Sequence, residues 1–328
     1  MIILSIETSC DESSVAITQN GKKILSNVVF SQIKEHQKFG GVVPEIAARK
    51  HSEFITLIYQ KALNQAKLNI KDIDLIAVTQ GPGLISALFI GINMANTLAY
   101  IHQKPLIAVN HLIGHIYSVQ IEYQLSFPCL ILLISGGHTD LFYMQDHFKI
   151  KHIGHTLDDA VGEVYDKIAR SLNLGYPGGP IIEKLALKGE DCYNFSRPYI
   201  KNKNLNFSFS GLKSQIVNFS KTKLSPKDIP NICASFQNSI VDVLIEKTKR
   251  ALNIFKVNQC AIVGGVAANQ FIKKSFEKHF HSINITVPSI KYCTDQAAMI
   301  GIAAYYQNKF YKKGQKKYNI RGNANLSL

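Results

Sequence analysis

The segment 129–145, CLILLISGGHTDLFYMQ, contains an apolar strand, a short loop of small polar residues and a second strand. Residues 2–18, IILSIETSCDESSVAIT, have the same order, with the polar turn TSCDESS between an apolar strand at 2–7 and the strand VAIT. Each segment predicts a β-hairpin. Because one hairpin lies near the start of the chain and the other in its middle, the pair predicts a duplicated domain.

Strands and helices alternate along the rest of the chain. We expect helices at 44–67, 84–101, 158–173 and 231–255, and strands at 74–80 and 259–264. This alternation is typical of an α/β fold. Two lobes that each open with a hairpin, whose loop can surround a phosphate, are the architecture of the actin–sugar kinase–Hsp70 superfamily, built from duplicated RNase H-like domains.

The domain boundary is expected near Ala108. The N-terminal lobe, 1–108, then carries the first loop, and the C-terminal lobe, 109–328, carries the metal site and the second loop. Residues 188–230 are polar and irregular and are interpreted as an insertion. The last helix can cross back to the first lobe.

The chain is basic, with a formal net charge of +14. Such a charge suits a polyanionic partner such as RNA. Lysine greatly outnumbers arginine, however, and a coding bias would produce the same excess. The basic segment 309–321 therefore either docks nucleic acid or is a solvated tail.

The six cysteines are scattered and form no C-x-x-C pair. This spacing favours a reduced, cytoplasmic protein and excludes a disulfide framework or a zinc ribbon. The apolar run before Glu7 is too short for a signal peptide. The apolar stretch 84–101 carries Ser, Asn and Thr residues, which favour a buried helix over a membrane span.

The segment VNHLIGHIYS, 109–118, predicts a metal site. His111 and His115 are four residues apart, so a helix would place them on one face. Asp295 begins a small-residue helix in YCTDQAAM and is either its N-cap or a third ligand. Two imidazoles and a carboxylate with an open position form a Lewis-acid site for zinc or ferrous iron. The absence of a carboxylate between the histidines argues against a metalloprotease.

Two glycine-rich loops are candidate phosphate or nucleotide sites. Gly136 and Gly137 of SGGHT allow close approach to a ligand, or serve only a hairpin turn. The segment GGVAANQ, 264–270, lies between a strand and a helix. Tight packing explains its glycines but not Asn269.

Three carboxylates have two open interpretations each. Asp166 either holds ribose hydroxyls or pairs with Arg170 one helical turn later. Asp11 and Glu12 in the first loop either face a ligand and a cation or are solvated turn residues.

Nine motifs together resemble one family in order and spacing, from residue 1 to about 305: IETSCDES, GGVVPEIAARKH, GPGL, HLIGH, ISGGHT, YPGGP, FSFSGLKS, GGVAAN and CTDQAAM. It is the tRNA N6-adenosine threonylcarbamoyltransferase family of bacterial and organellar type, formerly called O-sialoglycoprotein endopeptidases. The resemblance implies transfer of a threonylcarbamoyl group from threonylcarbamoyl-AMP to N6 of adenosine 37, in tRNAs that read codons beginning with A. It also implies one divalent metal per subunit, iron more often than zinc.

The resemblance assigns roles to individual residues. It implies that the metal ligands are His111, His115 and Asp295, and that Asp11 and Glu12 serve catalysis. The residues implied to contact the adenylate are Leu133, Ile134, Ser135, Gly136, Gly137, Asp166, Gly179, Glu183 and Asn269. The implied partners are tRNA, an upstream threonylcarbamoyl-AMP synthase, a dimerising paralogue and a small ATPase.

The chain departs from the family pattern around the ligands, at Asn110, Ile113, Gln296 and Ala297. None of these changes removes a ligand, but they leave the tuning and the identity of the metal open. A small-molecule kinase of the same fold and a non-catalytic dimerising paralogue remain alternative functions. Retention of all three ligands argues against the paralogue, and iron or zinc in the purified protein would argue against the kinase.

Overall fold

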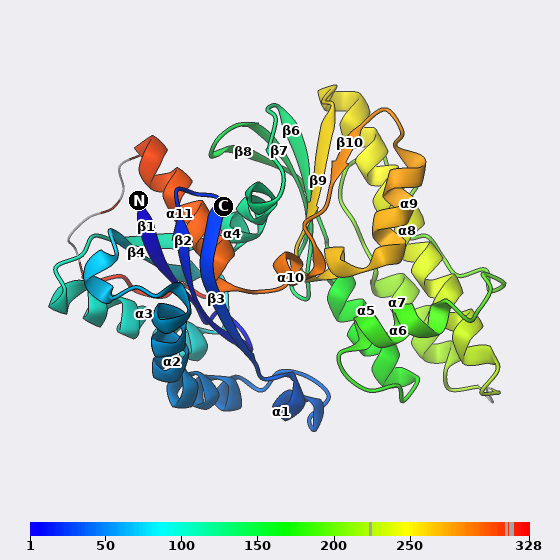
Figure 1. Ribbon diagram of the computed structural model, residues 1–328. Helices are drawn as coiled ribbons and strands as arrows, with labels where there is room; N and C mark the ends of the chain where they lie inside the picture. The colour runs from blue at the N-terminus through cyan, green and yellow to red at the C-terminus, as the bar shows by residue number, and fades with distance from the viewer. Residues whose placement is uncertain (223–224, 312–313, 315–317) are drawn as a thin grey trace. The chain divides into compact units, whose positions relative to one another are not determined.

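The computed structural model describes residues 1–222, 225–311, 314 and 318–328 (Figure 1). The chain forms two compact units, one of Met1–Gln124 with Thr294–Leu328 and one of Leu125–Cys293. The first unit thus extends past the expected boundary near Ala108, because β5 pairs with β4 and α4 packs against α11. The final helix belongs to this unit. Lys312, Lys313, Lys316 and Lys317, expected to contact tRNA, lie outside the described residues.

The first unit contains a five-stranded sheet in the order β3-β2-β1-β4-β5. Its strands are β1 (Ile2–Glu7), β2 (Glu12–Gln19), β3 (Lys23–Ser31), β4 (Leu75–Gly81) and β5 (Leu106–Asn110). Its helices are α1 (Ile33–Gln37), α2 (Pro44–Ala66), η1 (Ile70–Asp72), α3 (Ile85–Ile101), α4 (His111–Ser118), η2 (Val119–Ile121) and α11 (Ala297–Tyr311). Strands β1, β4 and β5 are parallel, so their carboxyl ends meet at one edge.

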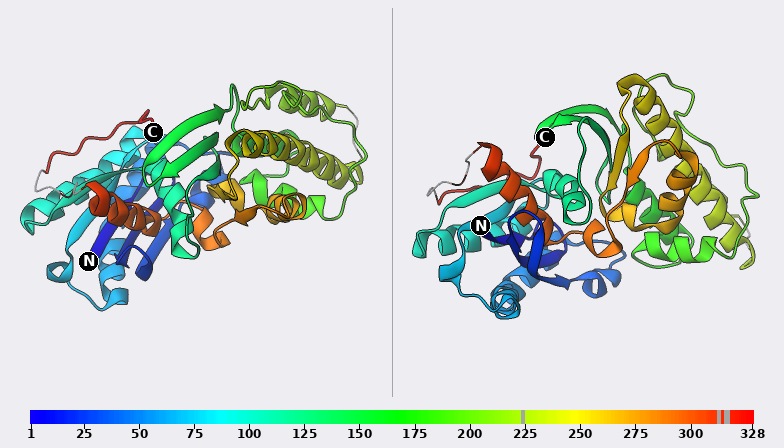
Figure 2. Two further views of the ribbon diagram at one scale, coloured as in Figure 1. Left: turned by 90° about the horizontal axis from the view of Figure 1, so that it is seen from above. Right: turned by 45° about the horizontal axis from the view of Figure 1, so that its top comes forward.

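Helices cover both faces of this sheet (Figure 2). Leu4 and Ile6 of β1 share a hydrophobic core with α2 and α3. Ser5 points the other way, as alternation along a strand requires, and its hydroxyl donates to the carbonyl of Ala297 at 2.6 Å. This contact fixes the start of α11 against β1.

The second unit contains a sheet of the same topology, in the order β8-β7-β6-β9-β10. Its strands are β6 (Cys129–Ile134), β7 (Thr139–Asp146), β8 (Lys149–His155), β9 (Gln259–Val263) and β10 (Asn284–Thr286). Its helices are α5 (Val161–Ser171), α6 (Gly178–Ala186), α7 (Ser210–Phe219), α8 (Asp228–Phe255), η3 (Gly265–Ala268), α9 (Gln270–His279) and α10 (Ile290–Cys293). Each sheet begins with three antiparallel strands and continues with two parallel ones. The predicted duplicated α/β fold is therefore confirmed.

The segment 188–230, interpreted as an irregular insertion, contains one complete helix in its described part. Residues 210–219 form α7, whose Leu212 and Ile216 are four residues apart and enter the core of the second unit. The polar composition of the surrounding segment conceals this short apolar face. In the described residues, no helix combines the length and the apolar character that a membrane crossing requires.

Candidate metal centre

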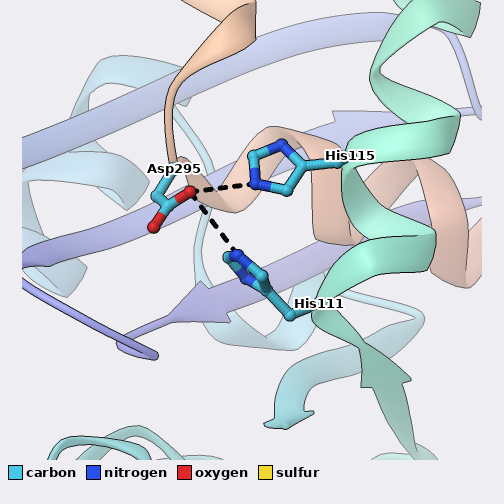
Figure 3. Close-up of side chains that lie close together, drawn as sticks. All are labelled: His111, His115 and Asp295. Atoms are coloured by element: carbon cyan, nitrogen blue, oxygen red, sulfur yellow. Dashed lines mark ion pairs between the residues drawn. The ribbon is translucent and has the colours of Figure 1, made fainter. Parts of the chain in front are cut away.

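The histidine pair lies on α4, which begins directly after β5. Asn110 is the N-cap of this helix, and its side-chain oxygen accepts hydrogen bonds from the backbone N–H groups of Leu112 (2.8 Å) and Ile113 (3.4 Å). One turn later, Gly114 permits close packing on α11, because a Cβ there would lie 2.7 Å from Cδ1 of Ile300. The cap and the glycine together place both histidines on the face of α4 that meets Asp295 (Figure 3).

The three expected ligands are brought together within the first unit. Oδ1 of Asp295 lies 3.0 Å from Nε2 of His115 and 3.5 Å from Nε2 of His111. One ligand atom from each residue lies within 4.8 Å of the others, so the group could hold a metal ion. His115 is only 1% exposed, its Nε2 is paired with the Asp295 carboxylate, and within the described part of the chain its Nδ1 makes no hydrogen bond. A buried imidazole that directs Nε2 at a carboxylate and at a second imidazole fits a metal ligand.

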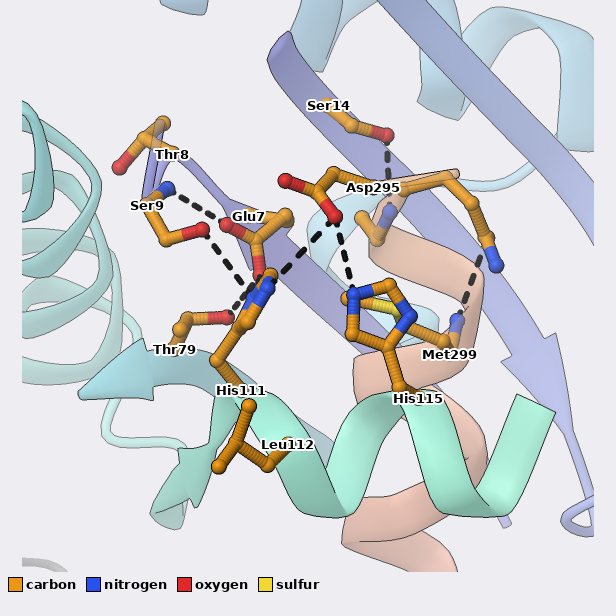
Figure 4. Close-up of polar contacts among 12 residues, drawn as sticks. Glu7, Thr8, Ser9, Ser14, Thr79, His111, Leu112, His115, Asp295 and Met299 are labelled. Atoms are coloured by element: carbon orange, nitrogen blue, oxygen red, sulfur yellow. Dashed lines mark hydrogen bonds and ion pairs between the residues drawn. The ribbon is translucent and has the colours of Figure 1, made fainter. Parts of the chain in front are cut away.

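Asp295 owes its position to the residues that follow it. Gln296, rather than Asp295, caps α11, since its side-chain oxygen accepts from the backbone N–H of Met299 at 3.2 Å. The N–H of Ala297 donates to the hydroxyl of Ser14 on β2 at 2.9 Å (Figure 4). The N-cap interpretation of Asp295 is therefore wrong, and its carboxylate faces the histidines instead.

The two histidines differ in their electrostatic surroundings. Burial opposes protonation of His111, but the negative charges of Asp295 and Glu7 outweigh it and raise the pKa of His111 to about 9. Burial dominates at His115 and lowers its pKa. A metal that binds this group must therefore displace a proton from His111 but not from His115.

The acidic pair Asp11 and Glu12 lies in the same unit. Asp11 is buried and Glu12 is half-buried, so the interpretation as solvated turn residues is wrong. Glu12 accepts a hydrogen bond from the hydroxyl of Ser31 at 3.0 Å. Burial, followed by the charges of Asp11 and Asp295, raises the pKa of Glu12 well above its usual value. The pair is thus electrostatically coupled to the candidate metal ligands.

The second hairpin loop, between β6 and β7, presents bare backbone. Gly136 and Gly137 are exposed, and within the second unit no heavy atom beyond their chain neighbours lies within 4 Å of a Cβ built on either. Neither residue has a positive φ. Ser135 and His138 close the turn around these glycines, and the backbone of both glycines stays open within the second unit. Leu133 and Ile134 are fully buried in β6, so they can contact a ligand only through their backbone.

Two further segments meet this loop at the carboxyl ends of β6 and β9. Gly264 follows β9 with a φ of +94° and packs on the carbonyl of Ile134. The N–H of Gly162, near the start of α5, donates to the carbonyl of Ser135 at 3.2 Å. The carboxyl ends of parallel strands are the usual place for ligands in α/β sheets. The arrangement therefore suits a nucleotide held largely by backbone groups.

Comparison with known proteins identifies the family. The family model described as tRNA N6-adenosine threonylcarbamoyltransferase matches residues 23–302. A protein of that name from Phytoplasma australiense is 58% identical over the whole of both chains. One from Staphylococcus haemolyticus is 49% identical over all of this chain and 96% of its own. The chain belongs to the tRNA N6-adenosine threonylcarbamoyltransferase family.

Solved structures agree on the fold. Full-length HypF in a phosphate- and nucleotide-bound form matches 94% of this chain and 46% of its own, with a TM-score of 0.64 at 13% identity. Component A of the (R)-2-hydroxyglutaryl-CoA dehydratase of Acidaminococcus fermentans matches 94% of this chain and 99% of its own, with a TM-score of 0.56 at 15% identity. At these identities the likeness supports the two-lobed fold and nothing finer.

The other residues expected at the adenylate of this transferase family lie in the second unit. Asp166 accepts from the N–H of Gly178 at 2.7 Å and so ties α5 to the turn before Gly179. Asn269 is the N-cap of α9, and its NH₂ donates to Gln237 at 2.9 Å. These bonds give Asp166 and Asn269 structural roles beside any contact with a ligand.

Glu183 and Gly179 both lie on α6. Glu183 accepts a hydrogen bond from the backbone N–H of Gln270 at 2.7 Å, at the start of α9. Gly179, like Gly136 and Gly137, has no second-unit atom within 4 Å of a built Cβ beyond its chain neighbours.

The departures from the family pattern leave the candidate ligands in place. Asn110 and Gln296 cap α4 and α11, and Ala297 packs on Ala16 of β2. Ile113 is buried on α4. Glu7 belongs to the motif IETSCDES, but a carboxylate at the end of a strand does not indicate by itself which side chain it meets. Glu7 is fully buried, with its Oε2 3.1 Å from Nδ1 of His111.

Proposed function

We propose that the protein carries out the reaction of its family with threonylcarbamoyl-AMP as the donor and with one divalent metal held by His111, His115 and Asp295. The reaction forms N6-threonylcarbamoyladenosine at adenosine 37 of tRNAs that read codons beginning with A. The observation that carries the metal proposal is the convergence of three ligand atoms, with Oδ1 of Asp295 3.0 Å from Nε2 of His115 and 3.5 Å from Nε2 of His111.

The donor set of two imidazoles and one carboxylate suits ferrous iron, which we propose as the metal, with zinc as the alternative. When bound, the metal would supply Lewis-acid polarisation of the threonylcarbamoyl carbonyl oxygen. The chain's own contribution is to hold three ligands on elements that are fixed by caps and close packing, so that the open position keeps its direction.

The adenylate part of the donor binds the second unit in this proposal. Backbone groups of the loop 133–137, above all those of the exposed Gly136 and Gly137, approach the phosphate together with Gly179. Asp166 accepts hydrogen bonds from the ribose hydroxyls. Asn269 and Glu183, at the start of α9, complete the site. The open glycines and the meeting of these segments at the carboxyl ends of β6 and β9 support this placement.

In the transfer step, N6 of adenosine attacks the carbamoyl carbon, the new N–C bond forms, and the bond from that carbon to the phosphate oxygen breaks. AMP leaves as an anion and needs no proton. The proton lost from N6 passes to Asp11, which we propose as the acceptor. Glu12 lies beside Asp11 in the sequence, and burial together with the charges of Asp11 and Asp295 raises its pKa well above the usual value.

The proposed partners are tRNA, a threonylcarbamoyl-AMP synthase that supplies the donor, a dimerising paralogue and a small ATPase, all in the cytoplasm. The net charge of +14 supports tRNA as the substrate. No observation favours the small-molecule kinase. The non-catalytic paralogue lacks support because all three candidate ligands are present and adjacent.

Nucleoside analysis of tRNA tests the proposal. The protein is incubated with unmodified tRNA, threonine, bicarbonate, ATP, the synthase and the accessory proteins, and the digested tRNA is analysed by mass spectrometry. We expect N6-threonylcarbamoyladenosine with the wild-type protein and none above background with His115→Ala. Equal product with both proteins would overturn the role of the metal group.

A further inference from the structure

Glu7 is a buried carboxylate with an unusually complete set of donors. Its side chain is fully buried at the end of β1. Oε1 accepts from the N–H of Ser9 at 2.5 Å, and Oε2 accepts from the hydroxyl of Thr79 at 2.5 Å (Figure 4). Oε2 also lies 3.1 Å from Nδ1 of His111. A charged group is retained in such a place only when it is paired and hydrogen-bonded.

The parallel strands explain why these residues meet. Glu7 ends β1, Thr79 lies close to the end of β4, and His111 follows β5 directly. All three strands are parallel neighbours in the order β1-β4-β5. Their carboxyl ends therefore lie at one edge of the sheet, and Thr79, on the middle strand, bonds the carboxylate between the other two. The position of Glu7 relative to His111 is thus set by the sheet and not by a mobile loop.

The contact with Glu7 uses the ring nitrogen of His111 that does not face the other ligands. Nδ1 faces Glu7 and the hydroxyl of Ser9, which lies 3.1 Å away. Nε2 faces Asp295. A carboxylate only accepts hydrogen bonds when it is ionised, so the proton of a neutral His111 belongs on Nδ1. The lone pair is then on Nε2, where a metal shared with His115 and Asp295 would need it.

We propose that Glu7 is the positioning residue of the metal centre, which holds the ring of His111 and fixes its tautomer so that Nε2 is the ligand atom. This inference rests on the proposed metal site. His115 differs, because in the described chain its Nδ1 has no hydrogen-bond partner. The site then has one histidine whose Nδ1 faces a buried carboxylate and one whose Nδ1 has no hydrogen-bond partner in the described chain.

Metal affinity tests the inference without recourse to activity. The apparent Kd for Zn²⁺ is measured by competition with a chelator for the wild type and for Glu7→Ala and Glu7→Gln, with folding checked by circular dichroism. We expect Glu7→Ala to bind about 10–100-fold more weakly, as for other carboxylates that support a metal-bound histidine. Glu7→Gln retains an oxygen acceptor, so its affinity for Zn²⁺ should lie between that of the wild type and that of Glu7→Ala.

Asp140→Asn is the matched control. Asp140 is also a buried carboxylate paired with a histidine, His152, at 2.8 Å, but it lies on β7 in the second unit. We expect it to leave the Zn²⁺ affinity at the wild-type value. A folded Glu7→Ala protein with wild-type affinity would overturn the role of Glu7.

Two further results keep this inference separate from the proposed function. If the wild type binds no Zn²⁺, or if His115→Ala binds it equally well, the metal site itself is wrong and the inference is overturned with it. If Glu7→Ala does not fold, ¹⁵N NMR of the Zn²⁺-loaded wild type with ring-labelled histidine decides. We expect the His111 signal, identified by its absence from His111→Gln, to show a protonated Nδ1 and a metal-bound Nε2. The reverse pattern would overturn the inference.

Discussion

The two hairpin loops occupy the same place in two sheets of the same topology, yet they are built differently. The loop between β1 and β2 buries its polar side chains: Thr8, Ser9 and Asp11 are all buried, and Ser9 bonds both Glu7 and His111. The loop between β6 and β7 exposes Gly136 and Gly137. Duplication thus preserved the strand order, while one copy came to support a site through side chains and the other through open backbone.

This difference predicts different sensitivities in the two units. In the first unit a substitution acts by removing a ligand or a group that holds one. In the second unit a substitution acts by filling space that the folded protein leaves open or by unpairing a hydrogen bond. Variants of the two units should therefore differ in whether they lose metal, ligand affinity or stability.

The largest effect is expected at His115. Replacing His115 by Ala removes one of three ligands, so bound metal should fall toward zero. The rate at which N6-threonylcarbamoyladenosine (t6A) forms should fall by a factor on the order of 10³, equivalent to several kcal/mol of transition-state stabilisation. Metal analysis and single-turnover kinetics measure the two quantities. His281→Ala, at an exposed histidine of the second unit, is the control and should change neither. If His115→Ala still bound one metal per subunit, the conclusion that side chains of the first unit hold the metal would be wrong.

A pair of glycine variants tests the open backbone of the second loop. Gly137→Ala adds a methyl group to space that is empty in the second unit, so we expect an unchanged melting temperature and AMP binding weaker by about 1–3 kcal/mol in calorimetry. Gly162→Ala should instead destabilise the fold by about 1–3 kcal/mol, because its Cβ would lie 2.7 Å from the carbonyl oxygen of Ser135. Normal AMP affinity in Gly137→Ala would show that the ligand does not approach this backbone.

Asp166 should show a smaller and more selective effect. Asp166→Asn can still accept the hydrogen bond from the N–H of Gly178, so the turn before α6 should be retained. The loss of a charged acceptor should weaken AMP binding by about 1–2 kcal/mol. Deoxy-AMP analogues provide the control, because the variant should bind them nearly as well as the wild type does. An equal loss for AMP and the analogues would exclude the ribose as the partner of Asp166.

The smallest effect concerns pH and the stability of the second unit. Asp159 is buried and pairs with Lys167 at 2.7 Å and Lys213 at 2.5 Å. Burial raises the pKa of Asp159, but the two lysines outweigh it, and the net pKa is lowered. The ionised form is therefore favoured in the folded state. Its contribution to stability is present above the unfolded pKa of about 4 and is lost as the pH falls through the lower folded pKa.

Urea unfolding measures this contribution. We expect Asp159→Asn to lower the free energy of unfolding by about 1 kcal/mol at pH 7, a small value because Lys167 is well exposed to solvent. The difference between variant and wild type should shrink toward zero near pH 2. A difference that is constant with pH would assign the effect to packing and not to the charge of Asp159.

The sequence supports the fold well where the signal is local. Alternation of apolar residues predicted both hairpins, and the helical periodicity predicted α2 and α3 nearly to the residue. It missed α7, because Leu212 and Ile216 lie in a polar segment and their burial depends on a core assembled from distant parts of the chain.

The metal ligands could be predicted only in part from the sequence. The spacing of His111 and His115 indicated one helical face, but Asp295 joined them on family resemblance, since its distance from them depends on the packing of α4 on α11. Glu7 could not be predicted, because three parallel strands bring it to His111. The open space at Gly137 could likewise not be predicted, because a sequence does not distinguish a glycine required by a turn from one required by a ligand.

We propose that a metal on the first unit and an adenylate on the second make separable contributions to the reaction. Metal-free protein, prepared with a chelator and then reloaded with ferrous iron or zinc, tests this claim when t6A formation and AMP affinity are measured on the same samples. We predict that the metal-free protein binds AMP with unchanged affinity, forms no t6A above background, and recovers activity on reloading. Full t6A formation by protein shown to contain no metal would contradict the account.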